Sequence, residues 1–477
     1  MKEDRNMLPY NWISTPLETI ISTVKGKKPK ILGSKSNDLQ IPYIDIKAIE
    51  RKIFSKYTNR ENCTMCEPDD NLIVWDGARC GWVGRGASGA VGSTLARIDT
   101  FNLSKSYLYY FLMSKFKEIN TKPKGVGIPH VDRNIFYTFN FPLPPLPEQH
   151  RIVEKIEELF TRLDAGVENL KQVQAQLKRY RQSVLKATVK GRLTAEWREK
   201  HKNELEPADK LLERIQTERK KKLGNKYKEP TPPNTTDLPE LPEGWVWAKL
   251  GQITHLITKG ASPRWQGFDY ADHGIKFIRS QNVGWGRLDT SKIAFLPEAF
   301  NMKEKKSILK KEDVLLNIVG ASIGRAAIAT EEVENANINQ AVSVIRLIDG
   351  ILINKFLMYY LISVDAQSRI HRKTVDVARA NLSLTDISEL CVPVPPFNEQ
   401  IAIVEEIERL FSITNGSEAL IEYELKRSQS LRQSVLKHAF LGKLVPQDPN
   451  DEPASVLLER IKADKGKAKK SKQMEIF

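Results

Sequence analysis

Four side chains in the first third of the chain are of types that could bind a metal ion. Cys63 and Cys66 form a CxxC pair, and Cys80 and His130 follow in the same half of the sequence. A structural zinc site needs about four such ligands to converge on one point. Because a single CxxC pair is weak support for such a site, we expect no metal to be bound.

Two proline pairs share part of the (Asp/Asn)-Pro-Pro-(aromatic) motif of amino-methyltransferases. Val394-Pro395-Pro396-Phe397 has valine in place of the polar residue that would hold the target amine. Leu143-Pro144-Pro145-Leu146 lacks the aromatic residue as well. We therefore interpret both segments as rigid joints between a strand and a helix.

Motifs for other catalytic chemistry are not evident either. The chain has no glycine-rich motif for S-adenosylmethionine, no Walker GxxxxGK[ST] motif and no HExxH motif. Glu304-Lys305-Lys306 is a bare ExK without a convincing upstream aspartate, which is poor support for a nuclease. The sequence predicts a protein that is not an enzyme by itself and has no catalytic residues.

Basic and amide side chains in predicted loops have the chemistry of nucleic-acid binding. Arginine suits guanine edges, asparagine and glutamine suit adenine edges, and most contacts from basic residues go to phosphate. The candidate DNA-binding residues of the first half are Lys25, Lys27, Lys28, Lys30, Arg79, Arg85, Lys122 and Lys124. Those of the second half are Lys259, Arg264, Arg279, Gln281, Asn282, Arg287 and Arg325.

The overall composition agrees with a polyanionic partner. The chain has 477 residues, and 74 Lys and Arg against 59 Asp and Glu give a net charge of +15. The excess is spread over both halves rather than gathered in one tail. No apolar run is long enough to span a membrane, the N-terminus has no secretory signal, and four cysteines cannot form a disulfide framework. We therefore expect a cytoplasmic protein that has no membrane contact.

An internal repeat organises the chain. Residues 142–160 (PLPPLPEQHRIVEKIEELF) and 393–411 (PVPPFNEQIAIVEEIERLF) are identical at 12 of 19 positions. Residues 181–193 and 432–444 match at 8 of 13 positions with the same separation of 251 residues, and EPADKLLERI at 206–215 returns as EPASVLLERI at 452–461. The globular segments before these blocks match only weakly. The chain is therefore a tandem duplication whose helical parts are similar and whose globular halves differ.

The repeated blocks have the pattern of long amphipathic helices. A heptad seam runs through Ile152, Ile156, Leu159, Leu163, Leu170, Val173, Leu177, Tyr180 and Val184. We predict a helix from Gln149 to about Lys190, roughly 65 Å long, that ends at Gly191, with a second copy that ends at Gly442. The two copies would pair as an antiparallel coiled coil that separates the globular halves by on the order of 35–70 Å, one or two turns of DNA. The alternative is two ordinary amphipathic helices, each lying on its own domain.

These features together resemble the specificity subunit of type I restriction–modification systems, over nearly the whole chain. The most specific are the paired PLPPLPEQ and PVPPFNEQ blocks, the IVEKIEELF and IVEEIERLF segments that follow, and each RQSVLK that leads to GRL or GKL. The LP…GW…LG opening at Leu241 to Gly251 is similar to the start of a target recognition domain in that family. The first half departs from it, with Tyr10-Asn11 where the second has Glu243-Gly244.

The resemblance implies a fold and a set of partners. The expected fold class is α/β, with two target recognition domains separated by long antiparallel coiled-coil helices in a tandem pseudo-symmetric duplication. The expected domains are a first target recognition domain (1–145), a first helical spacer region (146–225), a Pro-rich linker (226–240), a second target recognition domain (241–395), and a second helical spacer region with a basic tail (396–477). The partners are double-stranded DNA, two modification subunits that methylate adenine, and restriction subunits with translocase and nuclease activity. S-adenosylmethionine, ATP and Mg are expected on those subunits and no cofactor on this chain.

The predicted function is therefore a non-catalytic DNA-recognition subunit. It would read a bipartite DNA sequence and position adenine-N6 methyltransferase and restriction subunits. Two alternatives stay open at this point, namely a coiled-coil scaffold and a stand-alone DNA-binding regulator without enzyme partners.

Overall fold

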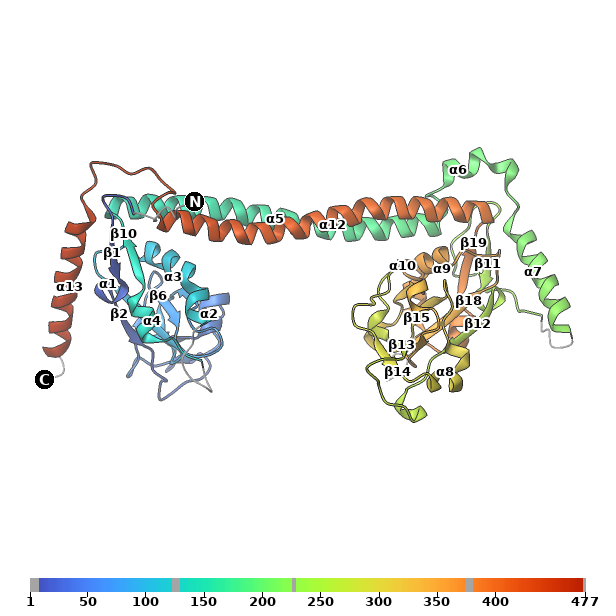
Figure 1. The fold of residues 1–477 in the computed structure, drawn as a ribbon, viewed down its shortest axis with the longest axis horizontal. Helices are drawn as coiled ribbons and strands as arrows, with labels where there is room; N and C mark the ends of the chain where they lie inside the picture. Colours follow the sequence, from blue (N-terminus) through green and yellow to red (C-terminus); the bar gives the residue numbers. More distant parts are fainter. Residues whose placement is uncertain (1–7, 122–128, 225–228, 374–380, 475–477) are drawn as a thin grey trace. The chain divides into compact units, whose positions relative to one another are not determined.

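The chain folds into two compact units that each contain one α/β head. The computed structural model describes residues 8–121, 129–224, 229–373 and 381–474. Unit 1 comprises Met1–Lys171 with Glu422–Phe477, and unit 2 comprises Gln172–Ile421. Figure 1 colours the chain by sequence, so that head 1 (residues 8–145) runs from blue to turquoise and head 2 (residues 241–396) from yellow-green to orange.

The described part of head 1 contains a two-stranded sheet, β1-β10, and two four-stranded sheets, β2-β9-β6-β7 and β4-β3-β8-β5. Strands β3 and β8 are parallel, whereas the other neighbours are antiparallel. The strands are β1 (Ile13–Pro16), β2 (Ile21–Lys25), β3 (Ile41–Ile44), β4 (Tyr57–Thr58), β5 (Met65–Cys66), β6 (Asn71–Val74), β7 (Val83–Arg85), β8 (Gly89–Val91), β9 (Leu95–Thr100) and β10 (Asn140–Leu143).

Head 2 repeats this arrangement in its described residues. The sheets are β11-β19, β12-β18-β15-β16 and β14-β13-β17, and here β13 and β17 form the parallel pair. The strands are β11 (Val246–Lys249), β12 (Thr254–Lys259), β13 (Ile275–Ile278), β14 (Ala294–Leu296), β15 (Val314–Asn317), β16 (Ala326–Ile328), β17 (Asn337–Ile338), β18 (Val342–Leu347) and β19 (Cys391–Val394). The duplication inferred from the helical blocks therefore extends to the heads.

Helices cover the sheets and connect the heads. The helices of unit 1 before the long helix are α1 (Leu17–Ile20), α2 (Ile46–Arg51), α3 (Lys105–Asn120) and α4 (Arg133–Thr138). The others are α5 (Leu146–Val189), α6 (Ala195–Lys200), α7 (Ala208–Leu223), α8 (Ala299–Lys303), α9 (Asn354–Leu361), α10 (Val364–Arg372), α11 (Leu384–Ser388), α12 (Phe397–Phe440) and α13 (Ala454–Met474). Among the described helices, none has both the length and the apolar character needed to cross a membrane.

Each unit has a core built from its head together with pieces of both long helices. In unit 1, Ile152 and Ile156 from the start of α5 and Phe440 from the end of α12 join Trp12 and Phe141 of head 1. The core of unit 2 is built in the same way, from the start of α12, the end of α5 and α7. Each long helix therefore begins in one unit and ends in the other.

The two long helices pair in antiparallel fashion within each unit, as predicted. In unit 1 the guanidinium of Arg432, on the last part of α12, lies 4.6 Å from the ring centre of Phe160, on the first part of α5. In unit 2 the guanidinium of Arg181, on the last part of α5, forms an ion pair with Glu418 (3.2 Å) and lies over Phe411 on the first part of α12. These pairings confirm the expected fold class.

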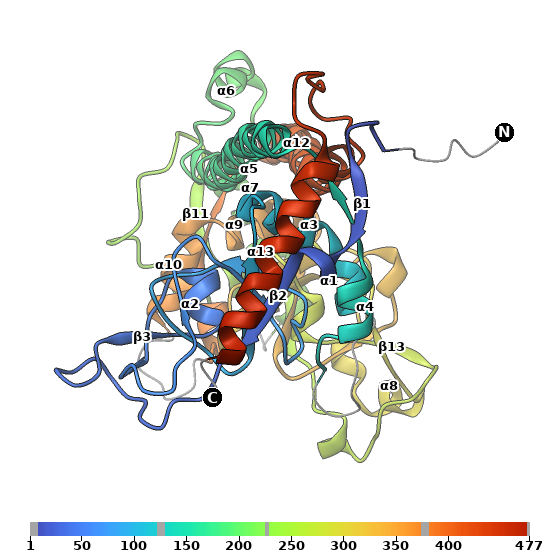
Figure 2. The ribbon, with the colours of Figure 1, turned by 90° about the vertical axis from the view of Figure 1, so that its left-hand side faces the viewer.

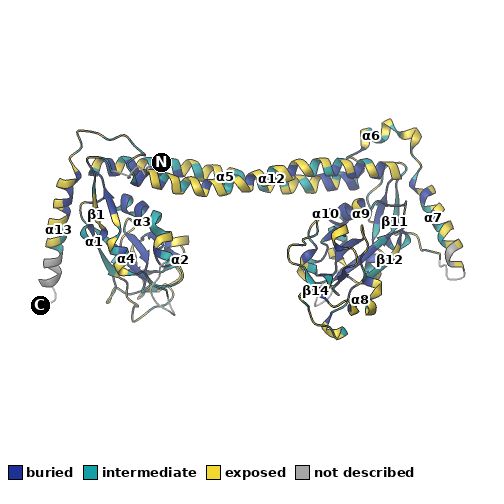
Figure 3. Cartoon of the chain, in the orientation of Figure 1, coloured by how far each residue is buried: buried dark blue, intermediate teal, exposed yellow. Residues whose placement is uncertain are grey.

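The heptad seam differs from the prediction in one respect. Ile152 and Ile156 are buried in the core of unit 1, as the alternative interpretation proposed, whereas Val173 and Tyr180 are 42% and 43% exposed. Figure 3 shows exposed residues along much of both long helices. The apolar stripe therefore packs against two different partners. Its first part packs against the head, and only part of the remainder lies against the partner helix.

Both long helices end at a glycine, as predicted. Gly191 (φ 61°) and Gly442 (φ 68°) adopt the left-handed conformation. The amides of Gly191 and of Arg192 donate to the carbonyls of Thr188 and Ala187, and the amides after α12 donate in the same pattern, which is a Schellman motif in both copies. A Cβ added at Gly191 would overlap the ring of Pro242, and one added at Gly442 would overlap the ring of Pro9.

The shorter helices after these glycines close each unit in the same way. The amide of Ala208, at the start of α7, donates to the carbonyl of Gly244 (2.9 Å), and the amide of Ala454, at the start of α13, donates to the carbonyl of Asn11 (3.1 Å). Helix α13 then packs beside α1 (Figure 2). The C-terminal segment thus completes unit 1 as the segment after α5 completes unit 2.

Candidate nucleic-acid interface

A buried glutamate at the start of each long helix fixes that helix to its head. The indole Nε1 of Trp12 donates to Oε2 of Glu148 (2.9 Å), and Nε1 of Trp245 donates to Oε2 of Glu399 (2.8 Å). Both carboxylates are almost fully buried. The strand-to-helix joints predicted at the two proline pairs are confirmed, because α5 begins three residues after β10 and α12 three residues after β19.

The glutamine that follows each glutamate holds the helix of the head. Gln149 accepts from the amide of Ser104 (3.0 Å) and donates to the carbonyl of Pro144 (3.0 Å). Gln400 accepts from the amide of Ile353 (2.8 Å) and donates to the carbonyl of Pro395 (2.9 Å). The repeated Glu-Gln pair is therefore a structural anchor that orients α3 and α9 against the long helices.

The two anchors differ in charge compensation. Oε1 of Glu399 accepts from Thr194 (2.7 Å) and from Nε of Arg198 (2.9 Å), so that the buried carboxylate has a cationic partner. Oε1 of Glu148 has no hydrogen-bond partner among the described residues. Burial raises the pKa of Glu148 above its ordinary value, with the Trp12 hydrogen bond acting in the opposite direction. The same motif thus lies in two different electrostatic environments.

The predicted DNA contacts of head 1 fall into two groups. Lys27, Lys28 and Lys30 are exposed on the segment that follows β2. Lys25, at the end of that strand, is also exposed but forms an ion pair with Asp76 (2.8 Å). Lys27, Lys28 and Lys30 are therefore accessible to solvent, and their contact with DNA stays a prediction. Lys122 and Lys124 lie outside the described residues.

The two candidate DNA-binding arginines of head 1 are held by neighbouring groups. Arg79 is exposed and forms an ion pair with Glu50 (2.8 Å). The guanidinium of Arg85 donates to Asn71 (2.9 Å) and Ser106 (2.6 Å) and lies 4.6 Å from the ring centre of Tyr109. Desolvation lowers the pKa of Arg85. The guanidinium of Arg85 therefore ties β7 to α3.

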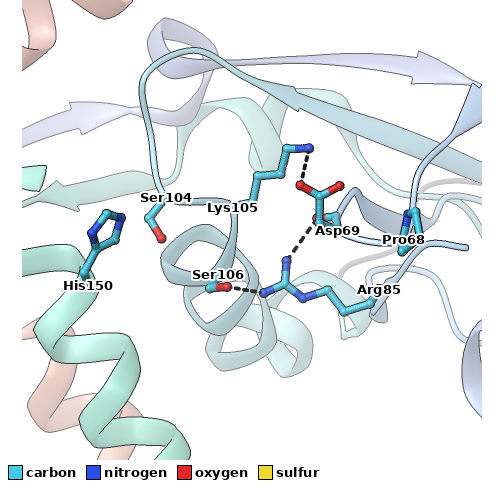
Figure 4. Close-up of a pocket in the computed structure, with 7 residues that line it drawn as sticks. All are labelled: Pro68, Asp69, Arg85, Ser104, Lys105, Ser106 and His150. Carbon is cyan, nitrogen blue, oxygen red and sulfur yellow. Dashed lines mark hydrogen bonds and ion pairs between the residues drawn. The ribbon is translucent and has the colours of Figure 1, made fainter.

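A pocket of about 610 Å³ lies beside Arg85 at the N-terminus of α3 (Figure 4). It is lined by Pro68, Asp69, Arg85, Ser104, Lys105, Ser106 and His150. Its basic groups would suit an anion, but Lys105 already binds Asp69 (2.9 Å) and Asp70 (2.8 Å). Lys105 is thus paired within the protein and Arg85 is bonded to Asn71 and Ser106, and we assign the pocket no ligand.

Head 2 presents a different set of side chains. Lys259, Arg264, Gln281 and Arg287 are exposed. Asn282 is buried and structural, since its side chain accepts from the amide of Arg279 (3.0 Å) and donates to the carbonyl of Asp289 (2.9 Å). The amide of Asn282 is therefore used within the loop, whereas the four exposed side chains can reach a ligand.

Arg279 and Arg325 lie half-buried in head 2. The guanidinium of Arg279 lies 5.8 Å from the ring centre of Tyr270, and its Nε has no hydrogen-bond partner among the described residues. Nε of Arg325 and Oδ1 of Asn317 are buried without a partner in the same described set. Because orphaned polar atoms of this kind are costly, these arginines remain good candidates for contacts with a polar ligand.

The candidate residues taken from the sequence were all basic or amide, so the exposed aromatic residues of head 2 were missed. Trp265 is 87% exposed, and Tyr270 and Trp285 are exposed by about half. Aromatic faces stack on nucleic-acid bases. For the two tryptophans, the available signal was their position close to Arg264 and Arg287 in glycine-containing loops.

The cysteines of head 1 have local partners. The thiol of Cys66 donates to the carbonyl of Ala87 (3.1 Å), and burial raises its pKa to about 11. The thiol of Cys63 donates to the carbonyl of Asn59 (3.3 Å). In the described ranges, no group of three or more His, Cys, Asp or Glu is placed to hold a metal ion.

Comparisons with known sequences agree with the duplicated architecture. The family model for the type I restriction modification DNA specificity domain matches residues 9–179 and again 242–427. The EcoBI specificity subunit of Escherichia coli is 27% identical over 469 residues, which cover 95% of this chain and 92% of that protein. The MjaVIII specificity subunit of Methanocaldococcus jannaschii is 26% identical over 439 residues, which cover 90% of this chain and 91% of that protein.

Solved structures share the fold. A chain from a type I R-M system, solved to explain complex assembly and conformational transition, has a TM-score of 0.61 at 18% identity and covers 92% of this chain and 99% of its own length. The HsdS subunit from Thermoanaerobacter tengcongensis has a TM-score of 0.50 at 19% identity, with coverage of 93% and 100%. Since the family model matches well over half of the sequence, the chain belongs to the family of type I restriction–modification DNA specificity subunits.

Proposed function

We propose that each head reads one half of a bipartite DNA sequence and that the long helices hold the two heads in register. The observation that supports this most directly is the contrast between the repeated parts. The Trp–Glu and Gln hydrogen bonds recur in both units, whereas the exposed candidate side chains are mainly lysines in head 1 and mainly arginine and glutamine, beside exposed tryptophans, in head 2. A common frame with different reading surfaces suits a target with two dissimilar halves.

The chemistry in this proposal belongs to partner subunits. The chain would act without catalytic residues, and two adenine-N6 methyltransferase subunits and the restriction subunits would bind it. S-adenosylmethionine, ATP and Mg would be held by those subunits. The family relationship favours this function over a coiled-coil scaffold or a stand-alone regulator.

Methylated-base sequencing of host DNA, with and without the gene for this chain, tests the proposal. We expect a bipartite motif to carry N6-methyladenine in the parent and to lose it completely on deletion. Restoring the gene on a plasmid should restore the same motif. If the deletion leaves every methylated motif unchanged while the modification subunit is still produced, the proposed function is wrong.

Replacing Lys27, Lys28 and Lys30 together with alanine should weaken DNA binding without changing the motif. For each phosphate that is no longer neutralised, the slope of log Kobs against log salt should become shallower by about 0.9. Titrations of the assembled methyltransferase with duplex DNA between low and moderate salt measure this slope. The matched control is alanine at Lys210, Lys220 and Lys221, which are exposed on α7. Equal slopes for the two triple variants would contradict the assignment.

A further inference from the structure

Both heads carry the same short pattern in the loop after β2 or β12. Residues 26–33 read GKKPKILG and residues 260–267 read GASPRWQG. At a constant separation of 234 residues, a glycine, a proline, a basic residue, a large apolar residue and a second glycine coincide. We call residues 26–33 tip 1 and residues 260–267 tip 2.

The two tips match in burial as well as in sequence. A Cβ added at Gly26 would overlap the carbonyl oxygen of Gly92, and one added at Gly260 would overlap that of Ile338. The proline of each tip is buried and the basic residue after it is exposed. The next residue is apolar yet faces solvent, with Ile31 54% and Trp265 87% exposed. The loops are thus built alike to present a basic and an apolar side chain outward.

Backbone hydrogen bonds hold tip 2 in a defined shape. The amides of Gln266 and Phe268 both donate to the carbonyl of Pro263 (2.9 and 3.0 Å). Nζ of Lys303 donates to the carbonyl of Gln266 (3.0 Å). The ring of Phe268 packs edge-on against Phe300, 5.5 Å between centres. Trp265 therefore projects from a loop that is tied to the body of head 2.

Tip 1 is fixed at the matching place. The hydroxyl of Thr58 donates to the carbonyl of Ile31 (2.8 Å), and the amide of Gly33 donates to the carbonyl of Tyr57 (3.1 Å). A large apolar side chain that its own backbone holds outside the core removes little apolar surface from water, so it contributes little hydrophobic stabilisation to the fold. Its repeated exposure in two otherwise divergent loops indicates a contact made with a ligand.

We propose that the two tips are DNA wedges, in which Lys30 or Arg264 binds a backbone phosphate and Ile31 or Trp265 enters the base stack at one step of its half-site. This inference rests on the DNA-recognition function proposed above. Apolar side chains beside basic ones are the combination that partly unstacks and kinks a duplex. Tip 1 contains three lysines, tip 2 contains an arginine, and neither contains an acidic residue.

A duplex fits the tips better than a protein partner does. The charge of both tips is purely positive, and an indole face can stack on any base. Base-pair steps differ with sequence in how easily they are deformed. A wedge would therefore favour some sequences at the step that it enters, even though it makes no hydrogen bond to a base edge there. The tips would thus help to select the target without reading a base directly.

Fluorescence of 2-aminopurine placed at successive positions of the methylated motif tests the wedge. The wild-type chain, assembled with its modification subunits, should raise the emission several-fold at one step of each half-site. Trp265→Ala should abolish the increase in one half-site and Ile31→Ala in the other, and each should weaken duplex binding about tenfold. Controls are Met302→Ala (74% exposed) and Ile53→Ala (53% exposed), which should retain both signals.

Four results would overturn the inference. Emission that stays constant along the motif while the complex binds the duplex would refute the wedges and leave DNA recognition intact. Emission that persists in both tip variants would refute the assignment to these residues. Tip variants that lose modification subunits but bind DNA normally once assembled would make the tips a protein contact. A wild-type complex that does not bind the duplex at all would reject the proposed function together with the wedges.

Discussion

Glu399→Gln should lower the free energy of unfolding of unit 2 by about 3 kcal/mol. The carboxylate of Glu399 is fully buried and accepts from Trp245, Thr194 and Arg198. An amide has only one acceptor oxygen, so one donor loses its partner and the guanidinium of Arg198, whose side chain is 16% exposed, loses its counter-charge. Thermal unfolding combined with hydrogen exchange of the Trp245 and Phe397 segments measures the loss.

The matched variant Glu148→Gln should behave differently in unit 1. The amide oxygen can still accept from Trp12, and the substitution removes a buried charge that has no partner on Oε1 among the described residues. We expect a stability at pH 7 that is unchanged or raised by about 1 kcal/mol. A loss as large as that of Glu399→Gln would show that the two anchors are electrostatically equivalent, contrary to the structure.

The difference in stability between wild type and Glu148→Gln depends on pH, and its sign follows from the direction of the Glu148 pKa shift. Because burial raises that pKa in the folded state, the folded protein holds the proton more tightly than the unfolded chain does. The stabilisation from Glu148 is therefore complete below its ordinary pKa of 4.5 and is lost as the pH rises through the raised folded value. The stability of Glu148→Gln relative to wild type should thus increase with pH above about 4.5 and then level off.

Gly191→Ala and Gly442→Ala should each cost about 2–4 kcal/mol. Both glycines have a left-handed backbone, and a Cβ would overlap the ring of Pro242 or Pro9. This overlap would push the C-terminal end of each long helix away from the first residues of the head that it contacts. Denaturant unfolding at constant ionic strength gives the two free energies.

The chain supplies its own controls for these glycines. Gly166 and Gly416 lie inside α5 and α12, where a Cβ would meet no neighbouring atom within 4 Å. Alanine at either position should stabilise the protein by roughly 0.5–1 kcal/mol, because glycine is a poor helix former. If all four substitutions destabilise alike, the close approach to the prolines is not the cause.

The long helices and the duplicated frame were predictable because their signals are local. A heptad stripe, a proline pair before the first turn and a glycine after the last turn determine where a helix begins and ends. The repeated blocks at a constant separation then required two equivalent helices. Short runs rich in apolar residues, at 41–44, 71–75, 276–278 and 314–316, are also a local signal, and the structure has strands β3, β6, β13 and β15 there.

The partners of these elements were not predictable because they lie far apart in the sequence. Trp12 reaches Glu148 across 136 residues, and Trp245 reaches Glu399 across 154. The heptad pattern could not distinguish residues that pack on a head from residues that face the other helix. Ile156 and Tyr180 both occupy seam positions, yet one is buried in the core of unit 1 and the other is half exposed.

The sequence by itself determined that this chain is a duplicated, basic protein with two long helices and two divergent heads. The tertiary structure alone decided which candidate side chains are available to DNA. The side chains of Arg85 and Asn282 form hydrogen bonds inside their own heads, whereas those of Trp265 and Ile31 are exposed to solvent. The physical reason is that the exposure of a side chain depends on packing between segments that are distant in the sequence. That packing cannot be predicted from the residue type alone.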